Sequence, residues 1–306
     1  MKTFTVFTAV FNGGMTIDRV YNSLLRQSFT DFEWLVIDDG STDNTAALVR
    51  SMMEESKIQI RLFQQKNMHQ FYSILKGIEW AEGKYFLLAD ADDEFREDSL
   101  LQLYNAFESI PLNEQINLLG VNCLCRNGNN QLIGDPYPRN RMISDHNEMR
   151  FKYNVKGEKW GMQRVDILRK FTFPSEYFNN GYIPQSVLWS KIAGEGYKIL
   201  FINETLRLYH NEKDRISIST NAVTNLKTNS FGSMQTLKGE INDQLKYFRY
   251  NPLYFLKIAM LYFEASKLQN INSFQQAQVL NSKAKLLYWI TYPFSLLFFL
   301  YRKITT

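Results

Sequence analysis

Four short apolar segments in the first 100 residues, separated from one another by helical patterns, constrain the fold of this chain more than any other feature. The segments cover residues 4–11, 34–37, 58–63 and 85–89. Between them, apolar residues recur with the spacing of an amphipathic helix. Short apolar strands that alternate with helices predict a parallel sheet covered by helices on both faces.

Acidic residues directly follow two of these predicted strands. Asp38 and Asp39 open the run DDGSTD after the second strand, and Asp90, Asp92 and Asp93 follow the fourth. Ligands of such sheets bind beyond the carboxyl ends of the strands. Carboxylates crowded there repel one another, and a Mg²⁺ or Mn²⁺ ion that bridges a diphosphate would compensate them. Helix capping is the alternative, which suffices for Asp43 but not for three carboxylates in four residues.

The composition is that of a globular chain. Of its 306 residues, 45% are hydrophobic and 22% are charged, which excludes a wholly disordered protein. The formal net charge of +4 is too small to indicate a nucleic-acid-binding protein, so we expect no nucleic-acid partner. The two cysteines, Cys123 and Cys125, are too close in sequence to bridge easily and predict free thiols in a reducing compartment.

The middle of the chain is less regular. Residues 118–125 and 131–134 flank an Asn-Gly sequence and predict a β-hairpin. The polar, turn-rich residues 135–159 predict a loop over the cleft, Pro184 predicts the start of a helix, and residues 198–209 predict a further strand. After about residue 230 the pattern is helical to the end of the chain.

Three N-terminal segments resemble the signatures of family 2 glycosyltransferases with the GT-A fold. They are FTAVFN at residues 7–12, VIDDGSTD at 36–43 and LADADD at 88–93. The resemblance covers about the first 100 residues and resumes near residues 159–219. The combination of DDGSTD after one strand with DxDD after another is specific, whereas either motif alone is weak.

The resemblance implies the fold class and the domains. The fold would be α/β, a Rossmann-like mixed sheet flanked by helices, with a helical C-terminal extension. The catalytic domain would cover residues 1–230, with a nucleotide-binding half at 1–110 and an acceptor-binding half at 111–230. A helical and membrane-associating region would follow at residues 231–306.

The resemblance also implies roles for individual residues. The nucleotide of the donor would contact Thr8, Phe11 and Asn12, and Asp38 or Asp39 would bind its base. In the DxD motif, which is Asp90-Ala91-Asp92 here, Asp90 would lie on the ribose side and Asp92 would ligate the Mg²⁺ or Mn²⁺ ion that holds the diphosphate. Further contacts to the phosphates or the metal are implied for Lys66 and His210.

Both of these last assignments have a plainer alternative. A solvated lysine is the commoner explanation of Lys66, and a lone histidine after a strand is more often structural. The sequences LRLYH at residues 206–210 and RIS at 215–217 resemble the closing motif of the family. In that motif a histidine can complete the metal site and a basic residue can face the diphosphate.

The chain departs from the family pattern at the expected catalytic base. Inverting transfer needs a carboxylate that takes the proton of the acceptor hydroxyl. Gln185 stands where the resemblance implies a glutamate, and an amide cannot act as a general base near neutral pH. Either a neighbour such as Glu176 or Asp166 substitutes, or the chain is impaired or altered, or the alignment is shifted by a few residues.

The C-terminal segment indicates contact with a membrane surface. Residues 286–301 form an apolar, aromatic-rich run of about sixteen residues that Pro293 interrupts, which is short for a span of roughly 20. Lysines and arginines flank this run, as in a helix that lies in the membrane interface. A helical pair packed on the catalytic domain is the alternative.

The resemblance, together with the C-terminal segment, therefore implies an inverting glycosyltransferase of cell-surface polysaccharide synthesis, peripheral on the cytoplasmic face of the cell membrane. Its donor would be a nucleotide-diphosphate sugar, a UDP-sugar first, and its acceptor a lipid-linked glycan or an oligosaccharide. A non-catalytic subunit that binds sugar nucleotides or glycans is the rival suggested by Gln185. A nucleotidyltransferase would need an Arg-containing Gly-rich loop, which residues 12–15 lack, and a dehydrogenase is disfavoured because no G-x-G-x-x-G follows the first strand.

Overall fold

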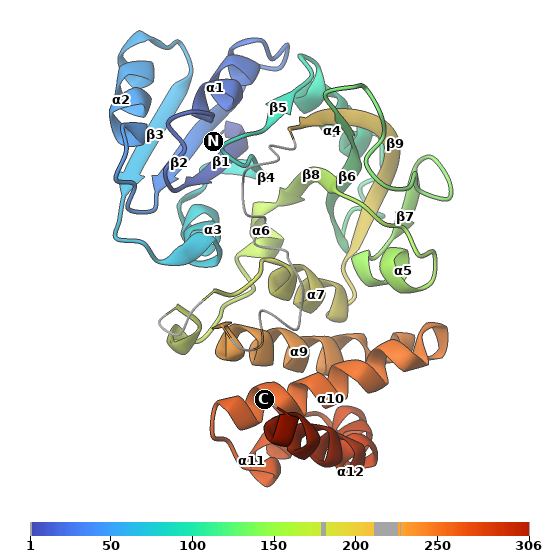
Figure 1. Cartoon of the computed structure of the whole chain (residues 1–306). Helices are drawn as coiled ribbons and strands as arrows, with labels where there is room; N and C mark the ends of the chain where they lie inside the picture. Colours follow the sequence, from blue (N-terminus) through green and yellow to red (C-terminus); the bar gives the residue numbers. More distant parts are fainter. Residues whose placement is uncertain (1, 179–181, 211–225, 227, 306) are drawn as a thin grey trace. The chain divides into compact units, whose positions relative to one another are not determined.

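A computed structural model of the chain describes residues 2–178, 182–210, 226 and 228–305. The chain forms two compact units that interleave along the sequence (Figure 1). The first unit comprises residues 1–145, 153–173 and 196–214, and the second comprises residues 146–152, 174–195 and 215–306. The catalytic domain expected at residues 1–230, its nucleotide-binding and acceptor-binding halves, and the membrane-associating region expected at residues 231–306 stay predictions.

The first unit contains the sheet, whose first four strands are parallel, as the apolar segments predict. They are β1 (Lys2–Val10), β2 (Phe32–Asp38), β3 (Gln59–Gln64) and β4 (Gly83–Leu88), in the spatial order β3-β2-β1-β4. All of their carboxyl ends therefore lie at one edge of the sheet.

Antiparallel strands extend this sheet into a mixed one. β8 (Lys159–Arg164) pairs antiparallel with both β4 and β6 (Leu118–Asn127), and β9 (Lys198–Tyr209) then pairs parallel with β6. Two short strands, β5 (Glu94–Phe95) and β7 (Met142–Ser144), pair antiparallel with β9. The predicted mixed α/β sheet is confirmed, and β9 has the bounds that the sequence predicts.

Side chains alternate between the two faces of a sheet along each strand. Both faces of the parallel strands present apolar side chains, and helices cover both. Phe4, Val6 and Trp34 point to a core shared with α1 (Ile17–Leu25), α2 (Thr45–Glu55) and α4 (Ser99–Glu108). On the opposite face, Phe7 stacks on Phe86 and contacts α3 (His69–Trp80). A Cβ at Gly77 of α3 would lie 2.4 Å from the Phe7 ring, so glycine permits this close approach.

The structure corrects two expectations for the middle of the chain. The predicted hairpin is reduced to a single antiparallel bridge between Arg126 and Leu132. The predicted loop over residues 135–159 contains β7 and a short helix, α5 (His146–Phe151), which belongs to the second unit. Phe151 of α5 packs against aromatic rings more than 90 residues later in sequence, and no local pattern announces such a contact.

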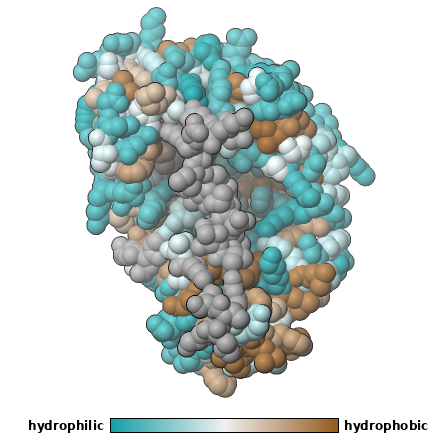
Figure 2. All heavy atoms as spheres, viewed as in Figure 1, coloured by the Kyte–Doolittle hydropathy of each residue, from teal (hydrophilic) through white to brown (hydrophobic). Residues whose placement is uncertain are grey.

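The second unit is helical. Its longer helices are α7 (Ser186–Gly194), α9 (Ser230–Gln244), α10 (Pro252–Leu268) and α12 (Ser282–Thr305), and the short helices are α11 (Ser273–Gln278), η1 (Ser175–Phe178) and η2 (Leu245–Tyr250). α10 packs against both α9 and α12 around a core rich in aromatic rings. Hydrophobic residues also gather on the surface of the C-terminal helices (Figure 2).

α12 continues through Pro293, although the sequence suggests an interruption there. A proline inside a helix removes one backbone hydrogen bond. Packing of Tyr292 and Phe299 against Phe263 of α10 holds the helix on both sides of that position. Within the described part of the chain, residues Ser282–Tyr301 form one segment long and apolar enough to cross a membrane, judged by length and composition alone.

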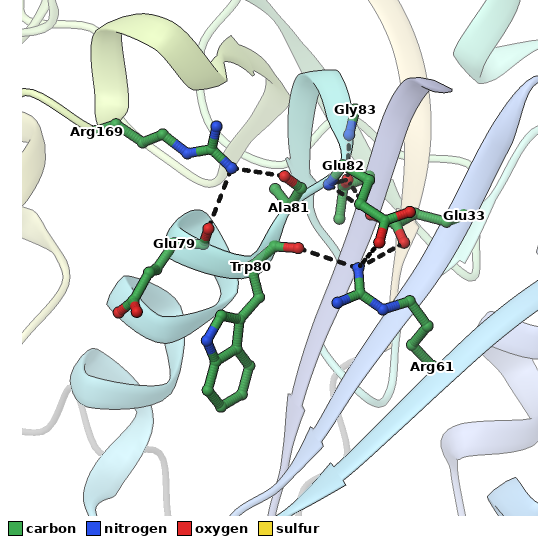
Figure 3. A network of polar contacts seen from close by, with 9 residues as sticks. Glu33, Arg61, Glu79, Trp80, Ala81, Glu82, Gly83 and Arg169 are labelled. Atoms are coloured by element: carbon green, nitrogen blue, oxygen red, sulfur yellow. Dashed lines mark hydrogen bonds and ion pairs between the residues drawn. The ribbon is translucent and has the colours of Figure 1, made fainter. Parts of the chain in front are cut away.

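A buried carboxylate organises the amino-terminal edge of the parallel strands (Figure 3). Glu33 of β2 is fully buried, accepts a hydrogen bond of 2.6 Å from the Thr5 hydroxyl and pairs with Arg61 at 3.0 Å. Arg61 also donates to the carbonyl of Trp80 at the end of α3. The ion pair therefore joins β2, β3 and the carboxyl end of α3 in the core.

Arg169 completes the capping of α3 from the other side (Figure 3). Its guanidinium donates to the carbonyls of Ile78, Glu79 and Ala81 at 3.1, 3.1 and 2.6 Å. The last carbonyls of a helix lack intrahelical partners and carry partial negative charge. Two arginines thus satisfy the carboxyl end of α3, whose amino end faces the candidate site.

Candidate functional site

The turn after β1 and the loop after β2 are joined by hydrogen bonds at the carboxyl edge of the sheet. Asn12, in the left-handed region with φ 53°, accepts from the backbone N–H of Thr42 at 2.8 Å. Its own N–H donates to the Ser41 hydroxyl at 2.9 Å. Asp43 accepts from the N–H groups of Gly14 and Thr45, so it satisfies the first N–H of α2 from the position before the N-cap, Asn44.

The end of β3 and the loop after it hold Asp38, the last residue of β2, and Asp39, which follows it. Both are almost fully buried. Asp38 accepts from the Ser41 N–H at 2.9 Å and from the Gln64 amide at 3.1 Å. Asp39 accepts through one oxygen, Oδ1, from the Gln65 amide at 2.7 Å and from the Met68 N–H at 2.8 Å.

Gly40 permits the close contact of these two loops. It has φ +84°, a conformation that L side chains rarely adopt. A Cβ at this position would also lie 2.8 Å from the backbone nitrogen of Asn67. The glycine of the DDGSTD run is therefore required by both conformation and space.

The acidic loop after β4 is held by a buried arginine from β9. Arg207, 3% exposed, donates to one oxygen of Asp93 from Nε at 2.6 Å and from an NH₂ group at 2.5 Å. The second oxygen of Asp93 accepts from the Asp90 N–H at 2.9 Å. The charge of Asp93, one of the three carboxylates, is thus neutralised inside the protein, and Asp93 fixes the loop. This role is neither helix capping nor metal binding, and the sequence did not indicate it.

Asp90 of the acidic loop connects this loop to α3. It accepts from the Gln70 amide at 3.1 Å and lies 3.5 Å from Arg207. Desolvation raises the pKa of Asp90 above its ordinary value, Arg207 opposes the rise and Asp92 adds to it. Desolvation lowers the pKa of Arg207, but Asp93 and Asp90 outweigh it and raise the pKa overall, so the guanidinium stays charged.

Asp92 is the acidic-loop residue whose chemistry fits a divalent cation. Its side chain is half-buried, and it is close enough to influence Asp90. Among the residues that the structure describes, no three His, Cys, Asp or Glu side chains form a metal-binding group. Mg²⁺ in proteins is commonly bound through one or two carboxylates plus substrate phosphates, so a single carboxylate at this edge satisfies the requirement.

His210 is placed against another carboxylate. Its Nε2 lies 3.0 Å from an Oε of Glu94, whose other oxygen is 3.4 Å from Arg26. The role of His210 as a metal ligand stays a prediction. The remainder of the closing motif, residues 215–217, lies outside the described part of the chain.

The other predicted nucleotide-binding residues differ in how far their side chains are exposed to solvent. Phe11 is 51% exposed beside the exposed Asn12, and Lys66 is exposed in the loop after β3. Ala91 lies beside the β1 turn, because a Cβ on Gly13 would come within 3.3 Å of its Cβ. Thr8 is fully buried, and its hydroxyl accepts from the Trp34 indole at 3.0 Å. The side chain of Thr8 thus lies in the core, and its role in nucleotide binding stays a prediction.

The candidate bases lie in different units. Glu176 is exposed on η1, and Gln185 is half-buried at the N-cap of α7, both in the second unit. Asp166 lies in the first unit at the start of α6 (Val165–Leu168), where Arg164 grips both of its oxygens at 3.0 and 2.5 Å. A carboxylate engaged in this way is a poor proton acceptor, which disfavours Asp166.

The sequence did not predict three side chains that hold the site aspartates, which are Gln65, Gln70 and Arg207 in its contact with Asp93. The position of Gln65 directly after a strand, at the same edge as the aspartates, is a signal that could have identified it. The two cysteines of β6 are free and buried, and burial raises the pKa of Cys125 to about 12. Neither thiol is therefore suited to be a nucleophile.

Comparison with protein families identifies one match. Residues 5–158 match the family described as "Glycosyl transferase family 2". The matched range covers half of the chain and includes the loops after β1, β2, β3 and β4, whereas Arg207 and His210 lie beyond it.

Individual relatives are more distant. The chain is 25% identical over 214 residues to the GalNAc(5)-diNAcBac-PP-undecaprenol beta-1,3-glucosyltransferase of Campylobacter jejuni, an alignment that covers 68% of this chain and 65% of that protein. The chain therefore spans slightly less than two thirds of the length of this relative.

Solved structures share the fold over nearly the whole chain. A TarS fragment from S. aureus in complex with UDP-GlcNAc has a TM-score of 0.56 and 18% identity, over 94% of this chain and 86% of that one. The mannosyltransferase PcManGT from Pyrobaculum calidifontis, in complex with GDP-Man and Mn²⁺, has a TM-score of 0.54 and 15% identity, over 99% and 88%.

Proposed function

Because this chain belongs to glycosyltransferase family 2 and has the GT-A fold, we propose that it transfers a sugar from a nucleotide-diphosphate donor to a glycan acceptor. The observation that carries the proposal is the convergence of Asp39, Asp90 and Asp92 at the carboxyl edge of the parallel strands, each in a loop fixed by hydrogen bonds. A UDP-sugar is the donor we propose first, because the similar TarS fragment binds UDP-GlcNAc.

The fixed loops divide the work of donor binding. Gln65 and Met68 hold Oδ1 of Asp39, which orients the carboxylate for an N–H group of the base. Gln70 holds Asp90 in the same way for the ribose hydroxyls. Ordered carboxylates bind a ligand without the entropic cost of ordering their side chains.

Asp92, with His210 as a second candidate, would hold Mg²⁺ or Mn²⁺, which when bound neutralises the diphosphate as it leaves. PcManGT is a GT-A protein solved with Mn²⁺. The proposed transfer proceeds with inversion. A carboxylate accepts the proton of the acceptor hydroxyl, the hydroxyl oxygen bonds to the anomeric carbon, and the bond from that carbon to the diphosphate breaks.

A lipid-linked glycan is the proposed acceptor, in synthesis of a cell-surface polysaccharide. The Campylobacter relative is named for an undecaprenol-linked substrate. Such an acceptor would place the enzyme at the cytoplasmic face of the cell membrane, where an apolar helix such as α12 would be useful. An oligosaccharide acceptor is the alternative.

A non-catalytic subunit that binds sugar nucleotides is the second candidate function. It is favoured by one observation, the amide of Gln185 at the N-cap of α7, where the family pattern implies an acid. Donor hydrolysis or transfer by the purified protein would separate the two functions, because a binding subunit shows neither.

The test of the donor site is a screen of nucleotide sugars by thermal unfolding, with and without Mn²⁺ or Mg²⁺. A saturating donor should raise the Tm by about 5 °C or more in the presence of metal. Asp92→Asn should abolish the metal-dependent part of this rise and leave the unliganded Tm unchanged, since an amide loses the charge that binds a dication.

Asp31→Asn is the matched control, because Asp31 lies at the opposite edge of the sheet and bonds to Thr3. This control should keep the full donor response. Unchanged donor affinity and activity in Asp92→Asn, together with insensitivity to EDTA, would remove the metal assignment.

A further inference from the structure

The outer face of α12 carries large apolar side chains. Leu286, Ile290, Phe294, Leu297 and Leu300 recur at helical spacing and are between 47% and 66% exposed. Phe274 of α11 is 73% exposed, and its ring contacts that of Trp289, which continues the same patch. Single exposed apolar residues are ordinary, but a continuous stripe along a whole helix indicates a binding surface.

The inner face of α12 carries both apolar and polar side chains. Ala284, Leu287, Tyr288, Thr291 and Ser295 are buried in the second unit, and Tyr292, Leu296 and Phe299 pack against the same core. The hydroxyls of Thr291 and Ser295 are satisfied by carbonyls of their own helix, and Tyr288 bonds to Gln276 of α11. A surface helix of a water-soluble domain turns a polar face outward. The outer face of α12 is apolar as well, which points to an outer environment that is itself apolar.

The charges around this face have one sign. From residue 265 to the end, the sequence contains Lys267, Lys283, Lys285, Arg302 and Lys303 and no Asp or Glu. Lys283 is exposed at the start of α12. Cations that flank an apolar aromatic helix are complementary to anionic lipid headgroups.

We infer that α12 lies in the plane of an anionic phospholipid bilayer, with its outer face among the acyl chains and its inner face on α10. The inference deepens the proposed function, since it supplies the surface by which the enzyme would reach a lipid-linked acceptor. A spanning orientation conflicts with the packing of α12, because its inner face is held by α10, which carries Lys257, Glu264 and Lys267. Moving that pair across a bilayer would bury those charges in hydrocarbon.

Co-sedimentation of the full chain with vesicles tests the inference. The protein should bind vesicles of phosphatidylcholine with phosphatidylglycerol, and bind phosphatidylcholine alone more weakly. Ile290→Gln/Leu297→Gln should weaken binding by about tenfold or more, because two apolar side chains leave the acyl region. Both positions face solvent in the protein alone, so the thermal unfolding midpoint should not fall.

Leu112→Gln/Ile116→Gln is the matched control, because these apolar residues are 80% and 69% exposed in the first unit. This control should bind vesicles like the native chain. Equal binding by the α12 variant, or no binding by the native chain, overturns the inference. A dimer in sedimentation velocity that the α12 variant dissolves, without vesicle binding, would assign the face to a second copy.

An alkaline carbonate wash of membranes distinguishes the orientation. Release of the protein supports a helix lying in the plane, whereas retention overturns it in favour of a spanning helix. Failure of the proposed function can be distinguished from failure of this inference. If no donor stabilised the protein, the proposed function would fail, but vesicle binding would be unaffected.

Discussion

At the residue scale, Arg207 both neutralises a buried carboxylate and fixes the conformation of the acidic loop. It is buried between Asp93, Asp90 and Glu158, and its bond to Asp93 spans 114 positions of sequence. Asp93 in turn accepts the N–H of Asp90, so a single guanidinium determines the shape of the loop that carries Asp92.

Arg207→Met should destabilise the protein by about 3–5 kcal/mol, because it leaves the buried carboxylate of Asp93 uncompensated. Urea unfolding at neutral pH measures the loss. Arg207→Met/Asp93→Asn removes both charges and should recover a large part of the stability. If the single variant were as stable as the native chain, the ion pair would not be what holds the loop.

The same contact shows why the site is only partly predictable. The sequence predicts Asp38, Asp39, Asp90 and Asp92 as site residues because they stand at or just after the ends of apolar strands, and parallel strands bring these ends to one edge. The contact between Arg207 and Asp93 joins β9 to the loop after β4, and no local spacing encodes it. The buried position of Thr8 depends likewise on Trp34 of the neighbouring strand.

At the scale of elements, predictability follows the length and locality of the pattern. The first four strands and three helices have strong periodicity of their own, and the structure reproduces them within a few residues. β5 has two residues, β7 has three, and β8 is formed by pairing between β4 and β6. Such elements depend on partners distant in sequence, so propensity alone does not reveal them.

α9 provides a prediction of pH dependence. Desolvation raises the pKa of Asp243 to about 6, opposed by Lys191, Lys238 and Lys246 and assisted by Glu195. An acid whose pKa is higher in the folded state binds protons more tightly there. Its contribution to stability is therefore full below the unfolded value of 3.8 and is lost as pH rises toward about 6.

Asp243→Asn should remove this dependence. The variant should gain stability relative to the native chain between pH 4 and pH 7, by about 1 kcal/mol after allowance for solvent screening. Urea midpoints measured across that range test the expectation. A gain that is the same at both ends of the range would show that the charge of Asp243 is not responsible.

At the scale of the whole molecule, the proposed reaction requires a base, and its two remaining candidates lie in the second unit. Gln185 occupies the N-cap of α7, and its carbonyl accepts from the Leu188 N–H at 3.0 Å. Negative charge near a helix N-terminus is stabilising by about 0.3–1 kcal/mol. Gln185→Glu should therefore fold normally, which makes its kinetic effect interpretable.

General-base assistance is worth roughly 10² to 10⁴ in rate. If the native chain lacks a base, Gln185→Glu should raise turnover on the proper acceptor. We expect instead an unchanged or lower rate, because the donor-side loops are fully formed and an idle site would have little reason to retain them.

Glu176→Gln then becomes decisive, because Glu176 is exposed on η1. Turnover lower by roughly 10² to 10⁴ with donor-induced stabilisation retained would identify the substitute base. Full activity in both Glu176→Gln and Gln185→Ala would remove both residues from the mechanism, and the base would then have to be sought elsewhere.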